Sequence, residues 1–170
     1  MSLKDRLHDE MTAAMRSGDA DRRDALRLAL NAVNTVEKRN LRPVTDDEVV
    51  TVLAREVKTR RESADAFQAG GRADLAAREE AGIAVVREFL PQALTDDEVR
   101  KLVTDAIVAT GATSARDLGK VMGWLSPRTR GRADGKRVSE LAAQALATAD
   151  LAAHGALHPP DPVAPEGSGG

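Results

Sequence analysis

Apolar residues recur with the spacing of amphipathic helices along most of this 170-residue chain. The first stripe consists of Leu3, Leu7, Met11 and Met15. Residues four positions apart lie on one face of an α-helix, so this stripe predicts a helix with one buried side. Ser2, followed by Asp5 three residues later, fits the start of that helix, and Ser17-Gly18 fits its end.

Three further helices are expected before Pro91. Their ranges are Asp19 or Asp21 to about Arg39, Thr45 to about Ala69, and Arg72 to about Leu90. Pro43 separates the first two of these helices and Gly70-Gly71 ends the second, because proline and glycine interrupt helices.

The pentapeptide TDDEV occurs twice, at Thr45 to Val49 and at Thr95 to Val99. The similarity does not extend into the flanking residues, so we interpret each copy as a helix start and not as part of an internal repeat. In such a capping box the threonine hydroxyl accepts a hydrogen bond from the amide three residues on. Glu48 or Glu98 then accepts one from the threonine amide. We expect neither copy to bind a metal, since no histidine lies nearby.

Three shorter helices are expected after the second TDDEV. Their ranges are Thr95 to about Thr110, Thr113 or Ser114 to about Leu125, and Asp134 to about Thr148. Ser126-Pro127 is expected to end the middle helix, because the residue before a proline disfavours helical geometry. Pro91 and the residues after it fit a domain boundary. We therefore predict an all-α protein with a four-helix domain at 1–92, a three-helix domain at 93–149 and a flexible tail at 150–170.

The composition also favours packed helices over sheets. Phe67, Phe89 and Trp124 are the only aromatic residues, and there is no tyrosine or cysteine. The core must therefore come from aliphatic residues and methionine, which suit helices, and disulfide and thiolate chemistry are excluded. The amino terminus is charged and amphipathic, and no apolar run reaches membrane-spanning length. We expect a cytoplasmic protein that does not bind membranes.

Candidate catalytic residues are scarce. His8, His154 and His158 are the three histidines. Each fits a solvated surface residue better than a catalyst, since His8 lies in the first turns of an exposed helix and the other two lie in or near the tail. Gly131 to Arg137 fails as a nucleotide-binding loop, because it has one residue too few between its glycines and an arginine where serine or threonine is required. We expect no catalytic residue, no metal site and no cofactor.

Basic and acidic residues alternate on the third expected helix. The basic residues are Arg55, Lys58, Arg60 and Arg61. We interpret them as pairing with Glu56 and Glu62 along the same helix, with partners four residues apart. A continuation of a binding face is the alternative.

Positive charge is concentrated between Arg116 and Arg137. This segment has seven basic and two acidic residues, a formal charge of +5 in a chain whose total is −2. The candidate nucleic-acid-binding residues are Lys120, Arg128, Arg130, Arg132, Lys136 and Arg137. Lys136 and Arg137 oppose the dipole of the helix that they begin, so local helix stability does not explain them. Charge alone leaves a phosphate-binding surface and a solvated loop as alternatives.

Two glycines stand beside these cations. Gly119 and Gly123 fall on one face of the expected helix and allow close approach of another backbone, either a neighbouring helix or a nucleic acid. Trp124 fits a residue that closes the helical bundle better than a stacking platform for single strands. Contacts to the backbone and shape of a folded RNA therefore suit this surface best.

Several stretches of the chain resemble the GatB/YqeY family, and in particular its small stand-alone members. In the amino-terminal part they are AAMRSGDADRRDALRLALNAVNTVE, TDDEVVTVLAREVKTRRESADAF, GGRADLAAREE and REFLPQALTDDEV; in the carboxyl-terminal part they are DLGKVMGWLSP and GRADGKRVSELAAQAL. The resemblance spans about Leu3 to Ala147. The chain departs from it at Gly82, where such proteins often carry glutamate, and at Phe89, where tyrosine is usual.

The resemblance implies an all-helical protein in two parts. The second part is similar to the tail domain of the B subunit of the tRNA-dependent glutamine amidotransferase, which helps to hold the tRNA. The residues that correspond to the tail motif are Gly119, Val121, Met122, Gly131, Ala133, Asp134 and Val138. The family label of a carbon-nitrogen ligase with glutamine as amido-N-donor comes with this resemblance. Because the amide chemistry occurs elsewhere in that complex, we expect no intrinsic activity here.

The sequence therefore favours a non-catalytic adaptor of translation that binds tRNA, another structured RNA or a tRNA-modifying complex. The alternative is a protein–protein interaction module whose partner docks on the helical faces, without direct RNA binding. Neutralisation of the loop arginines by carboxylates of the protein itself would favour this alternative.

Overall fold

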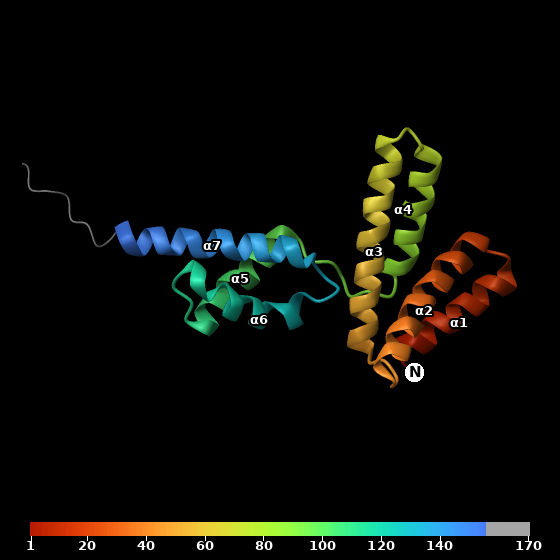
Figure 1. Ribbon diagram of the computed structural model, residues 1–170, viewed down its shortest axis with the longest axis horizontal. Helices are drawn as coiled ribbons and strands as arrows, with labels where there is room; N and C mark the ends of the chain where they lie inside the picture. Colours follow the sequence, from red (N-terminus) through yellow and green to blue (C-terminus); the bar gives the residue numbers. More distant parts are fainter. Residues whose placement is uncertain (156–170) are drawn as a thin grey trace, which may run out of the picture. The chain divides into compact units, whose positions relative to one another are not determined.

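The computed structural model describes residues 1–155, and its secondary structure in this range is entirely helical. The α-helices are α1 (Leu3–Ser17), α2 (Ala20–Asn40), α3 (Asp46–Ala69), α4 (Ala73–Arg87), α5 (Asp96–Thr110), α6 (Leu118–Thr129) and α7 (Gly135–Gly155), and a short 3-10 helix, η1 (Ala115–Asp117), precedes α6 (Figure 1). The prediction of an all-α fold is confirmed. None of the helices in this range is long and apolar enough to cross a membrane.

The chain forms two compact units. The first contains Met1–Thr95 and the segment Thr129–Asp134, and the second contains Asp96–Arg128 and, within the described range, residues 135–155. Thr129–Asp134 was assigned from the sequence to the second domain. In the structure it packs with the first unit, where the Leu94 amide donates a hydrogen bond of 2.7 Å to the Arg132 carbonyl.

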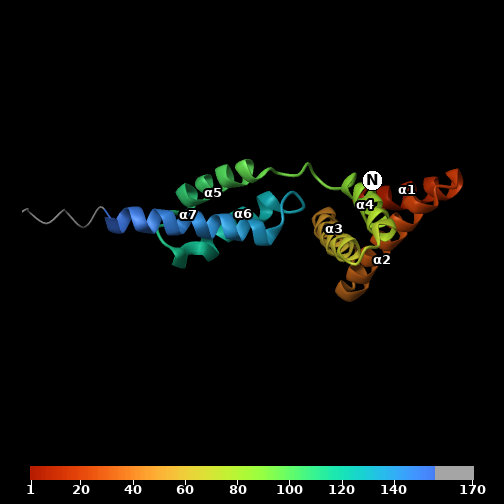
Figure 2. The ribbon, with the colours of Figure 1, turned by 90° about the horizontal axis from the view of Figure 1, so that it is seen from above.

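Two pairs of neighbouring helices build the first unit, α1 with α2 and α3 with α4 (Figures 1 and 2). Their buried faces form one core of Leu3, Leu7, Leu26, Ala29, Leu30, Val33, Val49, Leu53, Val86 and Phe89. Tight turns join the members of each pair. Gly18 adopts a left-handed backbone conformation after α1, and Gly70-Gly71 connects α3 to α4. These are the positions at which the sequence predicted the turns.

Local capping fixes where α1 and α3 begin. Ser2 and Asp5 form a capping box at α1, and Thr45 and Glu48 form another at α3, which confirms both predictions. The start of α3 also supports α1, because an Asp46 carboxylate oxygen accepts a hydrogen bond of 2.8 Å from the Leu3 amide. At the second TDDEV, α5 begins at Asp96, directly after Thr95.

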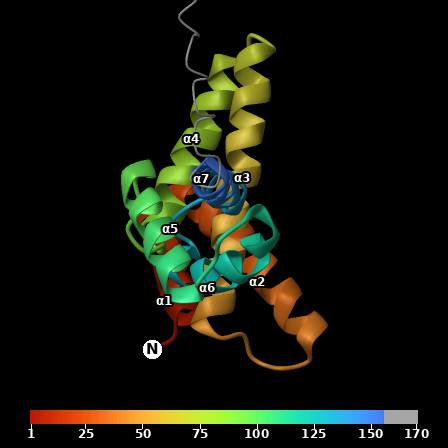
Figure 3. The same cartoon turned by 90° about the vertical axis from the view of Figure 1, so that its left-hand side faces the viewer.

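The second unit is built from α5, α6 and α7. Helix α5 packs against α7, which Figure 3 shows along its axis. The buried side chains of this unit are Val99, Val103, Ala106, Ala112, Val121, Leu125, Val138, Leu141, Ala142 and Leu146. They recur at helical spacing, as the sequence predicted for this part of the chain.

Three helix ends differ from the predictions. Helix α4 ends at Arg87, before Leu90, and α7 continues to Gly155 through residues that were assigned to the tail. The remainder of that tail, including His158, lies outside the described residues. Helix α6 continues through Pro127 to Thr129. Side-chain donors also reach two carbonyls of its last turns: Ser126 Oγ donates to Met122 O and Arg128 Nη1 donates to Trp124 O, both at 2.7 Å.

Candidate nucleic-acid interface

The six cations that the sequence singled out are divided between the two units. Lys120 and Arg128 lie on α6, and Lys136 and Arg137 lie in the first turn of α7, so all four belong to the second unit. Arg130 and Arg132 lie in the segment Thr129–Asp134, which packs with the first unit. The six residues therefore lie on α6, on α7 and on the segment that connects these helices.

Arg130 and Arg132 are engaged by the first unit. Arg132 is half-buried, and its Nε donates a hydrogen bond of 3.0 Å to the Gln92 carbonyl. Arg130 Nη1 lies 3.6 Å from a carboxylate oxygen of Asp47, which is itself 82% exposed. The contact of Arg132 helps to hold this segment, whereas an ion pair as exposed as that of Arg130 contributes little to stability.

The outward face of α6 carries two bare glycines. Val121 and Leu125 point into the core of the second unit, which leaves Gly119, Lys120 and Gly123 exposed on the other side. A Cβ atom at Gly119 or Gly123 would have no neighbouring atom within 4 Å among the described residues. The sequence left two possibilities for the backbone that approaches these glycines, a neighbouring helix or a nucleic acid. Within the described range no neighbouring helix approaches them.

A ridge of larger side chains borders these glycines. Lys120, Trp124 and Arg128 follow one another at intervals of four residues on α6, so they lie on one side of the helix. The guanidinium carbon of Arg128 lies 3.7 Å from the centre of the Trp124 ring, a stacked cation–π contact. The tryptophan thus holds the arginine. The spacing of four was visible in the sequence, but the expected end of the helix at Leu125 concealed it.

Arg137, in the first turn of α7, is paired within its own unit. Its Nη2 and Nε lie 2.5 and 3.2 Å from one carboxylate oxygen of Asp96, and Nη1 lies 3.6 Å from Glu140. The hydrogen bond from Arg137 lowers the pKa of Asp96, and the same bond raises the pKa of Arg137. The ion pair with Asp96 therefore accounts for the presence of Arg137 at the start of α7, where a cation opposes the helix dipole. No sign of this pairing between α5 and α7 was visible in the sequence.

The described part of the second unit has equal numbers of basic and acidic residues. Lys120 Nζ lies 3.3 Å from an Asp117 carboxylate oxygen, and Lys120 is 71% exposed. The pKa of Asp117 is lowered by hydrogen bonds from the Thr113 amide and from Lys120. Over Asp96–Arg128 and Gly135–Gly155 there are seven basic and seven acidic residues. The local excess of +5 in the linear sequence therefore does not extend to this unit as a whole.

The basic residues of α3 pair differently from the prediction. Arg60 lies 3.1 Å from Glu79 and Arg61 lies 2.7 Å from Glu80, both on α4. Lys58 lies 3.5 Å from Asp134. The expectation that Arg60 and Arg61 pair with Glu56 and Glu62 along the same helix was wrong, because α4 brings carboxylates closer than the next turn of α3 does.

The two histidines within the described range lie on helices of different units. His8 is exposed on α1, and His154 lies in α7. No three histidine, aspartate or glutamate side chains gather into a possible metal site in the part of the chain that the structure describes. The described features of the candidate site are ammonium and guanidinium groups beside an open glycine face, and these are ligands for anions.

These features define a small all-helical protein of two units, with a bare glycine face on α6 beside exposed cations. The chain belongs to the family of Yqey-like proteins, whose model matches residues 4–146. It is also similar to the uncharacterized protein C22F3.15 of Schizosaccharomyces pombe, with 29% identity over 86 residues that cover 51% of this chain and 70% of that protein. The resemblance to stand-alone family members inferred from the sequence is thus confirmed.

Proposed function

We propose that this protein is a non-catalytic adaptor of translation that binds tRNA or another structured RNA through the second unit. The observation that carries the proposal is the outward face of α6, where Gly119 and Gly123 are bare and Lys120 and Arg128 stand beside them. The exposed Lys136 and the half-buried Arg137 at the start of α7 add two cations of the same unit.

The glycines support this function because nothing in the described fold accounts for them. A glycine in an exposed helix costs about 1 kcal/mol relative to alanine, since its backbone loses more freedom on folding. The missing side chains at Gly119 and Gly123 would let a sugar-phosphate backbone approach α6 closely. Lys120 and Arg128 would then reach phosphate oxygens, and such contacts supply affinity with little sequence preference.

The ion pairs of the second unit are compatible with such a role. Exposed pairs contribute about 0–1 kcal/mol, so Lys120 can exchange Asp117 for a phosphate at small cost. Arg137 is held more firmly, because two of its nitrogen atoms contact Asp96. We therefore expect Lys120, Arg128 and Lys136 to contribute more to affinity than Arg137. The resemblance to a tRNA-holding tail domain favours tRNA among structured RNAs.

Paired substitutions test this proposal. The variant Lys120→Ala/Arg128→Ala should lose about 5- to 30-fold in affinity for a folded tRNA transcript in a fluorescence anisotropy titration, since two phosphate contacts contribute about 1–2 kcal/mol together. The matched control is Arg100→Ala/Lys101→Ala on α5, which removes the same charge from the same unit, including an arginine paired with Asp97 three residues away. Equal losses in both variants, or no loss in either, would contradict the proposal.

The second candidate function is a protein-interaction module that does not bind RNA directly. It is favoured by the contacts that already engage Arg130 and Arg132 and by the balanced charge of the second unit. Purification of the protein with its partners, with and without nuclease treatment, separates the candidates. Partners that are lost after nuclease treatment support the RNA adaptor, and partners that are retained support the interaction module.

A further inference from the structure

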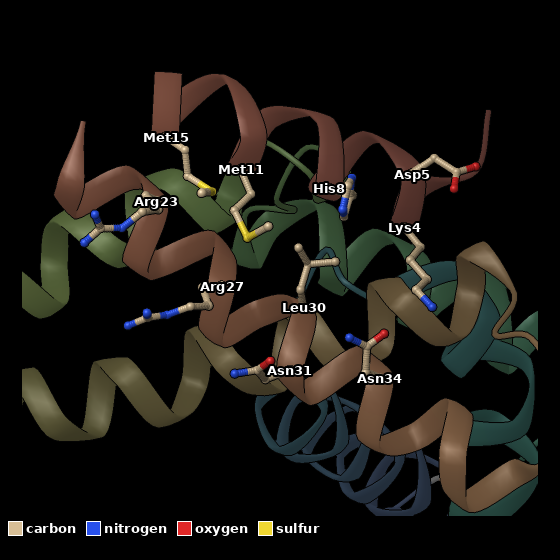
Figure 4. A pocket seen from close by; sticks show the side chains of 10 residues that line it. All are labelled: Lys4, Asp5, His8, Met11, Met15, Arg23, Arg27, Leu30, Asn31 and Asn34. Carbon is tan, nitrogen blue, oxygen red and sulfur yellow. The ribbon is translucent and has the colours of Figure 1, made fainter. Parts of the chain in front are cut away.

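The first unit contains a groove between α1 and α2 that none of the contacts described above fills. Its volume is about 720 Å³. Figure 4 shows side chains of both helices around it. The lining residues are Lys4, Asp5, His8, Met11, Met15, Arg23, Arg27, Leu30, Asn31 and Asn34.

The groove is elongated because its walls are two helical ridges. The ridge on α1 consists of Lys4, His8, Met11 and Met15, and the ridge on α2 consists of Arg23, Arg27, Leu30, Asn31 and Asn34. Side chains three and four residues apart line up along a helix. From Lys4 to Met15 the helix axis rises by about 16 Å, which is the length of about three turns.

The base of the groove is apolar. Leu30 is buried, Met11 is half-buried, and Met15 remains 59% exposed. Moving an exposed methionine side chain out of water lowers the free energy of the system. Its unbranched thioether also adapts to differently shaped partners. An apolar side chain from another molecule would complete this surface.

One end of the groove has more positive than negative charge. Arg23 and Arg27 lie 2.8 and 3.4 Å from the same carboxylate oxygen of Asp24, so two guanidinium groups share one counter-ion. Figure 4 places both arginines at the end near Met15 and Lys4 at the opposite end. Lys4 has a carboxylate partner of its own in Glu37. A ligand that carries an acidic group at the Met15 end would therefore match the charges of the groove.

From this geometry we infer that the groove binds an amphipathic helix of a partner protein. The bound segment has about three turns, apolar residues at intervals of three and four toward Met11, Met15 and Leu30, and an acidic residue toward Arg23 and Arg27. Helices bind in apolar grooves in this manner. The inference concerns the first unit and does not depend on RNA binding by the second.

A selection from displayed helical peptides tests the inference. The full-length protein is the bait, and the library fixes an apolar stripe while all flanking positions vary. We expect the selected peptides to carry aspartate or glutamate at one end. Met15→Glu should weaken the best peptide about tenfold or more, as expected for the loss of an apolar anchor. Arg23→Glu/Arg27→Glu should reverse the charge preference, so that a lysine-ended version of that peptide binds better.

Leu28→Glu is the matched control for Met15→Glu. Leu28 is an apolar residue of the same unit, is 50% exposed and lies outside this groove, so its replacement should leave peptide affinity unchanged. Circular dichroism melting curves of the variants show whether the fold is retained. The inference is overturned if no peptide is enriched, if Met15→Glu and Leu28→Glu have equal effects, or if selected ends are basic. Loss of a self-associated dimer or of RNA binding in Met15→Glu, without an effect on peptides, would also overturn it.

Discussion

Gly131 is a residue whose role depends on a neighbour far away in the sequence. Its φ angle of +70° lies in the left-handed region, which side chains disfavour. A Cβ atom at this position would lie 2.3 Å from Val50 Cγ1 and 3.5 Å from both Leu90 Cδ2 and Pro91 Cδ. The glycine is thus required both by the turn and by the packing of Thr129–Asp134 against the first unit.

Gly131→Ala should destabilise the protein by about 1–3 kcal/mol, because backbone strain and steric overlap act together. The measurement is the midpoint of urea unfolding of the full chain. Gly18→Ala is the control, since Gly18 has a φ of +77° and no neighbour within 4 Å of the Cβ position among the described residues. It should cost less than Gly131→Ala. Equal losses would show that the packing against Val50 is unimportant.

Glu48 combines a helix cap with an ion pair. Its carboxylate accepts hydrogen bonds from Arg42 at 2.8 and 2.9 Å and from the Thr45 amide at 2.9 Å. These bonds, with the one from Arg42 first, lower the pKa of Glu48 from 4.5 to about 2. The ionised group is therefore stabilised in the folded protein relative to the unfolded chain.

Because the folded-state pKa is the lower one, the contribution of Glu48 is fully present above pH 4.5 and is lost as the pH falls toward about 2. Glu48→Gln should thus lower the stability at pH 7 and reduce its decline between about pH 4.5 and 2. Unfolding midpoints measured across this range provide the test, with the exposed Glu62→Gln on the same helix as control. An unchanged pH profile in Glu48→Gln would contradict this account.

At the scale of helices, α3 and α4 are joined by two ion pairs of unequal burial. The Arg60 side chain is 12% exposed and its partner Glu79 is 26% exposed, whereas Arg61 and Glu80 are both nearly half exposed. Arg60 Nε is buried without a hydrogen-bond partner in the described structure, and its guanidinium group lies against Gly82. Arg60 therefore depends on Glu79 for compensation of its charge.

Glu79→Gln should cost about 1–3 kcal/mol, since it leaves a largely buried guanidinium group without its counter-ion. Glu80→Gln should cost about 0–1 kcal/mol, because water solvates Arg61 when its partner is removed. Urea unfolding of the two variants compares the same chemical change in neighbouring positions of α4. If Glu80→Gln is as harmful as Glu79→Gln, burial does not govern these pairs.

For the glycine face of α6, one substitution is expected to raise the stability of the fold and to lower the affinity for RNA. Gly123→Ala should stabilise the fold by about 0.5–1 kcal/mol, because alanine favours the helix and meets no neighbour at this exposed position. The same substitution should weaken RNA binding, because its methyl group prevents close approach of a backbone. Thermal unfolding and tRNA titration of one variant measure both effects. Unchanged RNA affinity in a stabilised variant would remove the glycines from the proposed interface.

For the whole molecule, those features of the fold that depend on interactions between residues close in sequence were predictable from the sequence. Ser2, Thr45 and Gly18 specify helix ends through neighbours within a few residues, and the apolar stripes specify the buried faces. The pairing of Arg137 with Asp96, and the position of Thr129–Asp134 in the first unit, depend on residues that are distant in sequence. Spacing along one chain does not reveal such partners. The candidate cations were therefore identified as a group, but their division and their counter-ions were not predictable.

The salt dependence of tRNA affinity tests the central claim most directly, because counter-ion release reports the number of phosphates contacted. If Lys120, Arg128, Lys136 and Arg137 all contact phosphates, the logarithm of the association constant should fall against the logarithm of salt concentration with a slope of roughly −2.8 to −3.6. Lys120→Ala/Arg128→Ala should reduce that slope by about half. A nearly flat slope for the unmodified protein, or an unchanged slope in the variant, would contradict RNA binding by this surface.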